Sequence, residues 1–104
     1  MSYRYTVRAT FLDAKVAQEW VDWLRNGHCS EVLDGGATKA EVVALEGSPT
    51  SFEVRYDFPD RAIFERYEET HAPRLRAQGL ELFPMTRGVE YFRSTGTVAH
   101  MEKS

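Results

Sequence analysis

The chain has 104 residues, of which 42% are hydrophobic, 28% charged and 12% aromatic. This length fits one domain, residues 1–104, and the composition excludes a disordered chain. The 13 basic and 16 acidic residues give a net charge of -3, and no stretch concentrates Lys or Arg. We therefore expect no nucleic-acid partner.

Cys29 is the only cysteine, so no intrachain disulfide can form, and a reducing compartment is favoured. Residues 1–8 enter a charged, alternating pattern without the apolar centre of a signal peptide, and no apolar run is long enough to span a membrane. We expect a cytoplasmic protein with no membrane partner.

The first half of the chain predicts a strand followed by two helical segments. Residues 3–11 alternate between apolar and polar side chains, as a half-buried strand does. Asp13 can cap a helix that ends near Gly27, a residue suited to the left-handed conformation. A further helical turn follows over residues 28–33, so His28 lies at a corner between helices.

The middle of the chain predicts a hairpin. Residues 38–45 are rich in β-branched side chains but alternate imperfectly, which is typical of an edge strand. Residues 47–50 have the composition of a turn, and residues 52–58 alternate cleanly. We expect the second strand of this hairpin to be central in its sheet.

The last third predicts a helix that breaks, followed by a strand. Asp60 is placed to cap the helix, and Pro73 should kink or restart it near residues 70–72. We expect Gly79 to end this helix. Residues 89–95 then predict a fourth strand.

The order β-α-β-β-α-β predicts an α+β, ferredoxin-like sandwich: a four-stranded antiparallel sheet with both helices on one face. Its core is expected over residues 3–95, with a polar tail or weak edge extension at residues 96–104. The open face either meets solvent or lines a cavity enclosed by a second copy. Its expected residues are Arg4, Thr6, Arg8, Thr10, Glu53, Arg55 and Asp57.

Several short motifs identify a resemblance: Asn26-Gly27-His28, Gly36-Ala37-Thr38, Arg55-Tyr56-Asp57-Phe58-Pro59, Phe64-Glu65-Arg66-Tyr67, His71-Ala72-Pro73-Arg74-Leu75-Arg76 and Gly88-Val89-Glu90-Tyr91. Through them, residues 3–93 resemble a family of small bacterial proteins of unknown function with the dimeric α/β-barrel form of the ferredoxin-like fold. The resemblance implies a homodimer packed through its open sheet faces and favours an enclosed cavity. It implies no activity. Relatives sharing the fold include cofactor-independent monooxygenases, haem-degrading enzymes and stress-responsive barrels, and fold alone does not choose among them.

His28 and His71 are the candidate catalytic and ligand-binding residues, because imidazole exchanges protons near neutrality. If His71 ends a helix, the helix dipole favours its charged form, which suits it to bind an anion. The alternative is structural: each ring donates to a backbone carbonyl at its corner. Arg74 and Arg76 are both expected on a solvated face, and Arg74 is in addition a ligand candidate that could join His71 around an anion.

Arg8 and Arg55, together with Arg4, are candidates to bind a small carboxylate or phosphate anion. Glu53 and Asp57 nearly cancel their charge, so cross-strand ion pairs at a dimer interface are the favoured interpretation.

We expect no metal site and no cofactor. Cys29 and Glu31 stand near His28, but adjacent side chains seldom point the same way and no paired Cys or His motif is present. Cys29 is expected to be a packing residue. Trp20 and Trp23 are expected to anchor their helix in the core, in preference to forming a stacking platform for a ligand.

The sequence thus predicts a homodimeric α/β-barrel protein that binds a small molecule, an anion being one candidate, or serves as an accessory module without catalysis. The alternative is a cofactor-independent enzyme of the isomerase or monooxygenase type that uses His71 or His28 for proton transfer. An enzyme needs a pocket into which an imidazole and an apolar wall both open.

Overall fold

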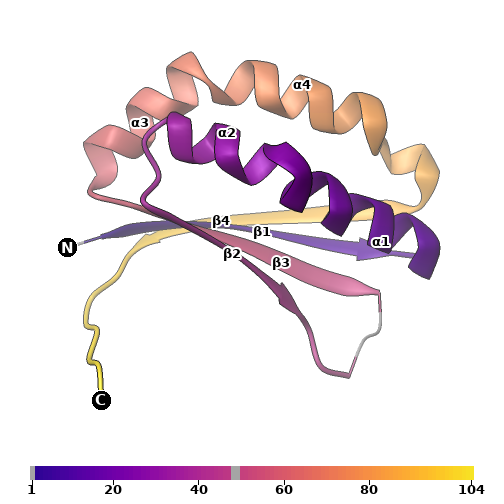
Figure 1. Ribbon diagram of the computed structural model, residues 1–104, viewed down its shortest axis with the longest axis horizontal. Coiled ribbons are helices and arrows are strands. Elements are labelled where there is room, and N and C mark those ends of the chain that lie inside the picture. Colours follow the sequence, from indigo (N-terminus) through magenta and orange to yellow (C-terminus); the bar gives the residue numbers. More distant parts are fainter. Residues whose placement is uncertain (1, 48–49) are drawn as a thin grey trace.

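A computed structural model describes residues 2–47 and 50–104. Four strands form one antiparallel sheet: β1 (Tyr3–Phe11), β2 (Lys39–Ala44), β3 (Ser51–Phe58) and β4 (Val89–Thr97). Their order is β2-β3-β1-β4. All helices lie on one face of this sheet (Figure 1). The ferredoxin-like fold predicted from the sequence is confirmed, with β3 and β1 central and β2 at an edge.

Strand alternation separates an apolar face from a polar one. Tyr5 pairs with Tyr56 and Val7 with Val54, and these side chains point toward the helices. On β4, the residue in register with Val7 is Arg93, so this arginine also lies on the helix side. The buried strand residues of this face are Tyr3, Tyr5, Val7, Ala9, Phe11, Val54, Tyr56, Phe58 and Val89.

The first helical arm consists of α1 (Ala14–Trp23), a π-helical segment (Leu24–His28) and α2 (Cys29–Asp34). The Asp13 carboxylate begins it by accepting a hydrogen bond from the Lys15 amide at 2.8 Å. Gly27 has φ 152°, within the left-handed region that favours glycine. The chain turns there and resumes as a helix, which places His28 at the predicted corner.

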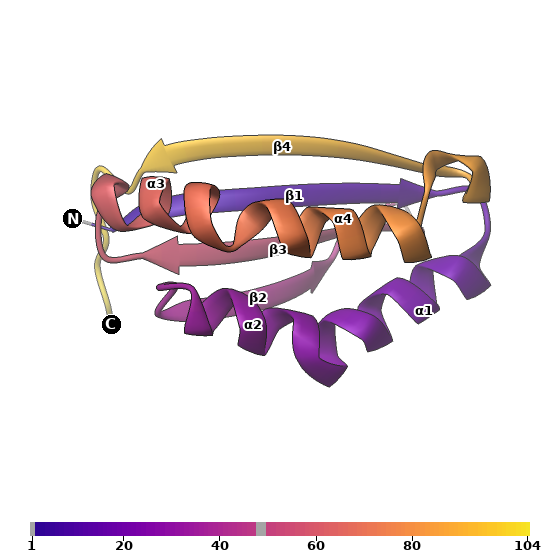
Figure 2. The same ribbon diagram turned by 90° about the horizontal axis from the view of Figure 1, so that it is seen from above.

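The second arm consists of α3 (Arg61–Thr70) and α4 (Ala72–Leu82), which lie side by side with the first arm over the sheet (Figure 2). Asp60 caps α3 by accepting from the Ile63 amide at 2.9 Å. The predicted break occurs at His71, before Pro73 in the first turn of α4. The prediction that Gly79 ends the helix was wrong. Gly79 lies inside α4, where an added Cβ would stand 3.2 Å from Trp23, so close packing explains this glycine.

The remaining boundaries are near those predicted. A 3-10 turn (Met85–Arg87) leads into β4, which continues through Thr97. Residues 98–104 contain no helix or strand and extend to the side of the sheet away from the helices (Figure 1). Part of the turn predicted at residues 47–50 lies outside the described residues. No helix in the described part of the chain is long and apolar enough to cross a membrane.

Candidate functional site

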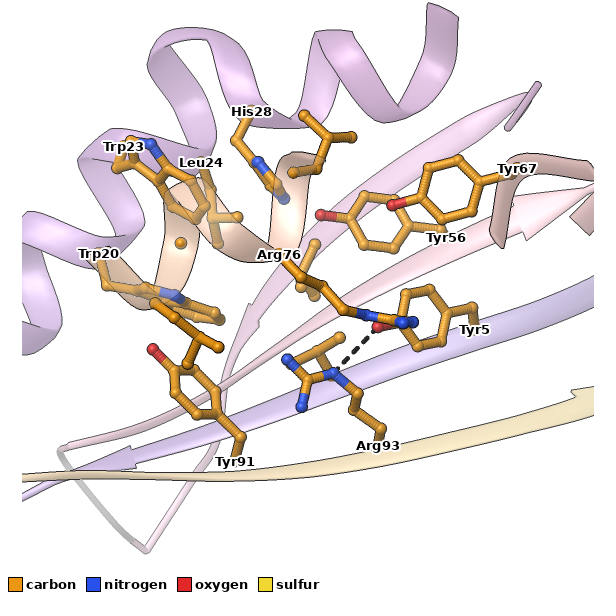
Figure 3. A pocket seen from close by; sticks show the side chains of 15 residues that line it. Tyr5, Trp20, Trp23, Leu24, His28, Tyr56, Tyr67, Arg76, Tyr91 and Arg93 are labelled. Atoms are coloured by element: carbon orange, nitrogen blue, oxygen red, sulfur yellow. Dashed lines mark hydrogen bonds between the residues drawn. The ribbon is translucent and has the colours of Figure 1, made fainter. Parts of the chain in front are cut away.

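A pocket lies between the helices and the sheet (Figure 3). Its cavity volume is about 60 Å³, and it opens to solvent at its mouth. Side chains from β1, β3 and β4 line one side, and side chains from α1, α4 and the corner at His28 line the other. The lining residues are Tyr5, Val7, Trp20, Trp23, Leu24, His28, Val54, Tyr56, Tyr67, Leu75, Arg76, Gly79, Leu80, Tyr91 and Arg93.

His28 enters this pocket from the corner between the π-helical segment and α2. Its ring stacks on Trp23, with centroids 4.0 Å apart. Nδ1 of His28 is buried and has no hydrogen-bond partner among the described residues. Burial lowers the pKa of His28 to about 4, although the charge of Glu31 opposes this shift. The imidazole is therefore neutral at pH 7, able to accept a proton or a hydrogen bond.

Tyr56 supplies a second polar group from the sheet side. Its hydroxyl is buried and has no oxygen or nitrogen partner in the described part of the chain. The Cys29 thiol, a weak hydrogen-bonding group, approaches it. Burial is the main cause of the raised pKa of Tyr56, so this hydroxyl keeps its proton. His28 and Tyr56 thus bring one polar atom without a partner among the described residues and one with only a weak thiol neighbour to the same pocket, which suits a polar ligand atom.

Two arginines lie at the end of the pocket beside Tyr5, whose ring stacks on Tyr56 with centroids 5.9 Å apart. Nε of Arg93 donates a hydrogen bond to the Tyr5 hydroxyl at 3.1 Å, and the Arg76 guanidinium approaches the same hydroxyl (Figure 3). Arg76 also pairs with Glu68 at 2.6 Å. Burial disfavours the charge of Arg76, but Glu68 and Tyr5 outweigh it and raise the pKa of Arg76. This end is cationic.

Aromatic and aliphatic side chains form the remaining walls of the pocket. Trp20 is buried, whereas Trp23 is half-buried and packs on Phe83, with ring centroids 5.6 Å apart. The Tyr91 hydroxyl donates to the Phe83 carbonyl at 2.7 Å, which fixes its ring. The prediction that both tryptophans anchor the helix is confirmed by their packing. Both also line the pocket, which the sequence did not indicate.

His71 and Arg74 do not line this pocket. Nδ1 of His71 lies 2.8 Å from the Thr70 hydroxyl, and its ring stacks on Tyr67 at 6.3 Å. The Arg74 guanidinium lies 3.6 Å from the Glu31 carboxylate and is exposed. The structure therefore pairs Arg74 with an acid on α2, and His71 with the end of its own helix.

The open sheet face carries paired charges. Arg4 lies 2.8 Å from Asp57, Arg8 3.1 Å from Glu53, and Arg55 2.8 Å from Glu53. The Arg55 and Arg8 hydrogen bonds outweigh burial and hold the pKa of Glu53 below its usual value. Arg4–Asp57 and Arg8–Glu53 are cross-strand ion pairs of the kind that the sequence favoured, whereas Arg55 and Glu53 both belong to β3. A shallow second hollow, lined by Arg4, Thr6 and residues 94–98, lies on this side.

Metal-binding residues do not cluster in the structure. Over residues 2–47 and 50–104, no three His, Cys, Asp or Glu side chains are grouped to hold an ion. Burial is also the main cause of the raised pKa of Cys29, which keeps it a thiol. Cys29 packs against the hydrophobic core.

Sequence similarity now identifies the family. A family model described as a domain of unknown function, DUF4286, matches residues 3–94. The chain belongs to the DUF4286 family. This confirms the resemblance to an uncharacterised family that the sequence motifs indicated. No curated protein matches the chain in sequence.

Solved structures share the fold of this DUF4286 protein at low identity. A dimeric ferredoxin-like protein from an uncultured marine organism is 18% identical, with TM-score 0.72 over 97% of this chain and 98% of that chain. SnoaB, a cofactor-independent oxygenase from Streptomyces nogalater, is 12% identical, with TM-score 0.71 over 96% and 95%. A monooxygenase from the gene ActVA-Orf6 of Streptomyces coelicolor, in complex with nanaomycin D, is 11% identical, with TM-score 0.69 over 98% and 93%.

The sequence interpretation of the DUF4286 chain missed Tyr5, Tyr56, Arg76 and Arg93 as pocket residues. Arg93 alternates in step with Val89 and Tyr91, the residues of β4 that face the helices. This position in the alternation could have indicated that Arg93 lies on the helix side. Arg76, expected on a solvated face, is 39% exposed and also lines the pocket. Arg76 follows the buried residue Ala72 by four positions, so both lie on the same side of α4. The break at Pro73 interrupts the helical periodicity, so the sequence did not show this.

Proposed function

We propose that this DUF4286 protein binds a small organic molecule in the pocket between its helices and its sheet. The observation that carries the proposal is Nδ1 of His28, which is buried without a partner among the described residues, together with the Tyr56 hydroxyl, whose neighbour is only the weakly bonding Cys29 thiol, beside an otherwise aromatic wall. A buried polar atom without a partner costs about 1–3 kcal/mol. A ligand that hydrogen-bonds to both atoms would recover part of that cost, which is typical of a binding site.

We propose that the binding form is a homodimer joined through the open sheet faces. The charges on that face are balanced by the pairs Arg4–Asp57 and Arg8–Glu53–Arg55, which suits a self-complementary interface. A structurally similar marine protein is described as dimeric. Light scattering after size exclusion should give twice the 11.9 kDa of one chain. A monomer at micromolar concentration would contradict the dimer and leave the pocket untouched.

Binding can be followed without a label, because the chain has 2 tryptophans and both line the pocket. We expect phenylacetate, which absorbs little at tryptophan excitation wavelengths, to change their fluorescence saturably and to raise the melting temperature. The variant Leu80→Phe, at an exposed position that lines the pocket, should narrow it and weaken this response about threefold or more. Failure of phenylacetate to produce any saturable change would count against the pocket as a ligand site.

A second candidate function is cofactor-independent proton transfer, as an isomerase would perform. The neutral imidazole of His28 in the pocket favours it. In an enolisation, His28 would accept a proton from the carbon beside a carbonyl group and return it to the carbonyl oxygen. The Tyr56 hydroxyl would donate a hydrogen bond to that oxygen and keep its own proton, so keto and enol forms differ only in proton position.

Phenylpyruvate tests this candidate, because its enol absorbs in the ultraviolet and its tautomerisation is followed directly. We expect the protein to accelerate tautomerisation without added metal or cofactor. The variant His28→Gln should lose the acceleration, and His71→Gln, outside the pocket, should keep it. Equal rates for native protein and His28→Gln would exclude His28 as the proton-transfer residue.

A further inference from the structure

The cationic end of the pocket offers hydrogen-bond donors and no free acceptor. Arg93 uses its Nε–H on the Tyr5 hydroxyl, and its terminal nitrogens make no hydrogen bond to any described residue. The Tyr5 oxygen accepts this bond, and no described side chain or carbonyl accepts its O–H in return. A phenol has one donor, and guanidinium has donors alone. The ligand group that fits here must accept hydrogen bonds.

The charges at this end leave one positive charge unpaired. Arg76 lies 2.6 Å from Glu68, which neutralises it. Arg93 lies over the Tyr91 ring, with its guanidinium carbon 5.4 Å from the ring centroid. No carboxylate within the described ranges forms an ion pair with Arg93. An acceptor group with a single negative charge therefore matches both the donors and the charge.

The rest of the pocket defines the body of the same ligand. Trp20, Trp23 and Tyr91 give flat apolar walls, against which an aromatic ring packs well. His28 offers a polar atom without a partner among the described residues, and Tyr56, whose ring stacks on Tyr5, offers a hydroxyl with only a weak thiol neighbour (Figure 3). These groups are neutral, so they suit a hydroxyl or carbonyl group on the ligand and do not require a second charge.

We propose that the ligand is an aromatic monoanion whose charged oxygens lie between Arg93 and the Tyr5 hydroxyl. This inference rests on the proposed function, because it specifies the class of molecule that the same pocket takes. Arg93 acts as the residue that selects for the anion, and Tyr5 positions the guanidinium by accepting its Nε–H. The open-face arginines play no part, because each is paired with a carboxylate.

Phenylacetate and phenylacetamide test the charge, because they share size and shape and differ by one negative charge. Isothermal titration calorimetry should give about tenfold or more tighter binding of phenylacetate at low salt. The variant Arg93→Gln should lose this preference. Arg66→Gln removes the same charge from an exposed position of α3 outside the pocket, and it should keep the preference.

Tyr5→Phe provides a second variant, which keeps the ring in the core and removes only the hydroxyl. We expect a loss of selectivity of about threefold or more, because Arg93 loses its fixed orientation. Equal binding of the two probes by native protein would overturn the anion inference and leave the pocket as a binding site. A preference that survives both Arg93→Gln and Tyr5→Phe would overturn the assignment to these residues. Failure of both probes to bind would contradict this inference and the proposed function together.

Discussion

Two groups of arginines lie on opposite faces of the same sheet and differ in what neutralises them. On the open face, Arg8 and Arg55 share the buried carboxylate of Glu53. On the helix face, Arg76 is paired with Glu68, but the solvent-exposed Arg93 interacts, among the described residues, with a hydroxyl and an aromatic ring and with no carboxylate. The arginines of the first group are already paired with carboxylates, whereas the second group includes Arg93, whose charge is available to bind a ligand.

This difference shows why arginine content alone does not locate an anion site. An arginine already bonded to a carboxylate would have to exchange that partner for the ligand, with little net gain. An arginine held by a hydroxyl keeps its charge available and its orientation fixed. The four predictions that follow test whether the two faces differ in this way.

The largest effect is expected from reversing one charge on each face. Arg93→Glu should weaken phenylacetate binding about a hundredfold or more, because attraction becomes repulsion at the anion position. Arg8→Glu makes the same charge change on the open face and should leave phenylacetate affinity within about twofold. Calorimetry on both variants measures the two phenylacetate affinities. If Arg8→Glu proves the more damaging to binding, the site lies on the open face.

The second effect concerns pH and His28. An unfolded histidine has a pKa near 6.5, and burial lowers the pKa of His28 to about 4. Between these values the unfolded chain binds more protons, so the free energy of unfolding falls as pH falls from 6.5 to 4. From pH 6.5 to pH 4, the free energy of unfolding of the native protein should therefore fall by about 2 kcal/mol more than that of His28→Gln.

Urea unfolding of both proteins at several pH values measures this difference. His71→Gln is the matched control, because it removes another histidine from outside the pocket. A difference between the native protein and His28→Gln that stays constant from pH 6.5 to pH 4 would show that His28 is not held neutral by burial.

A smaller effect is expected from Glu53→Gln on the open face. Arg8 and Arg55 lose the charge of their shared partner, and the free energy of unfolding should fall by about 1 kcal/mol. Phenylacetate affinity should not change. Chemical denaturation and calorimetry on one sample give both numbers, and a loss of affinity without a loss of stability would reverse the roles of the two faces.

The smallest effect is expected from Gly79→Ala. The added Cβ would stand 3.2 Å from the Trp23 ring, so the ring must shift by a few tenths of an ångström. We expect phenylacetate affinity to change about threefold, with Ala favouring the helix by up to about 1 kcal/mol. Gln78→Ala, one residue earlier on α4 and exposed, is the control that should leave affinity unchanged.

Much of the fold could be predicted from local patterns. Alternation defined β1 and β3, the carboxylates of Asp13 and Asp60 defined two helix starts, and Pro73 marked the break. Gly79 misled because a glycine near a helix end resembles a cap, whereas here it accommodates a tryptophan from another helix. Such a contact between distant segments leaves no local signal.

The candidate site was predicted only in part. His28 was identified from its residue type and its corner, but His71 and Arg74 have the same local character and lie outside the pocket. What distinguishes them is which side of each helix faces the sheet, and this is a property of the tertiary structure. Arg93 carried a readable signal, an arginine in the apolar phase of a strand. Its unpaired charge depends on which carboxylates lie nearby in space, and the sequence does not show that.

The central claim is that the pocket under the helices, and not the open face, receives the ligand. A nitrogen-15 NMR titration with phenylacetate tests it most directly, using the indole signals of Trp20 and Trp23 and the Nε–H signals of the arginines. We predict that both indole signals and the Arg93 signal shift with one saturation curve, while Arg8 and Arg55 stay unchanged. Saturable shifts of Arg8 and Arg55 with unmoved indole signals would contradict the claim.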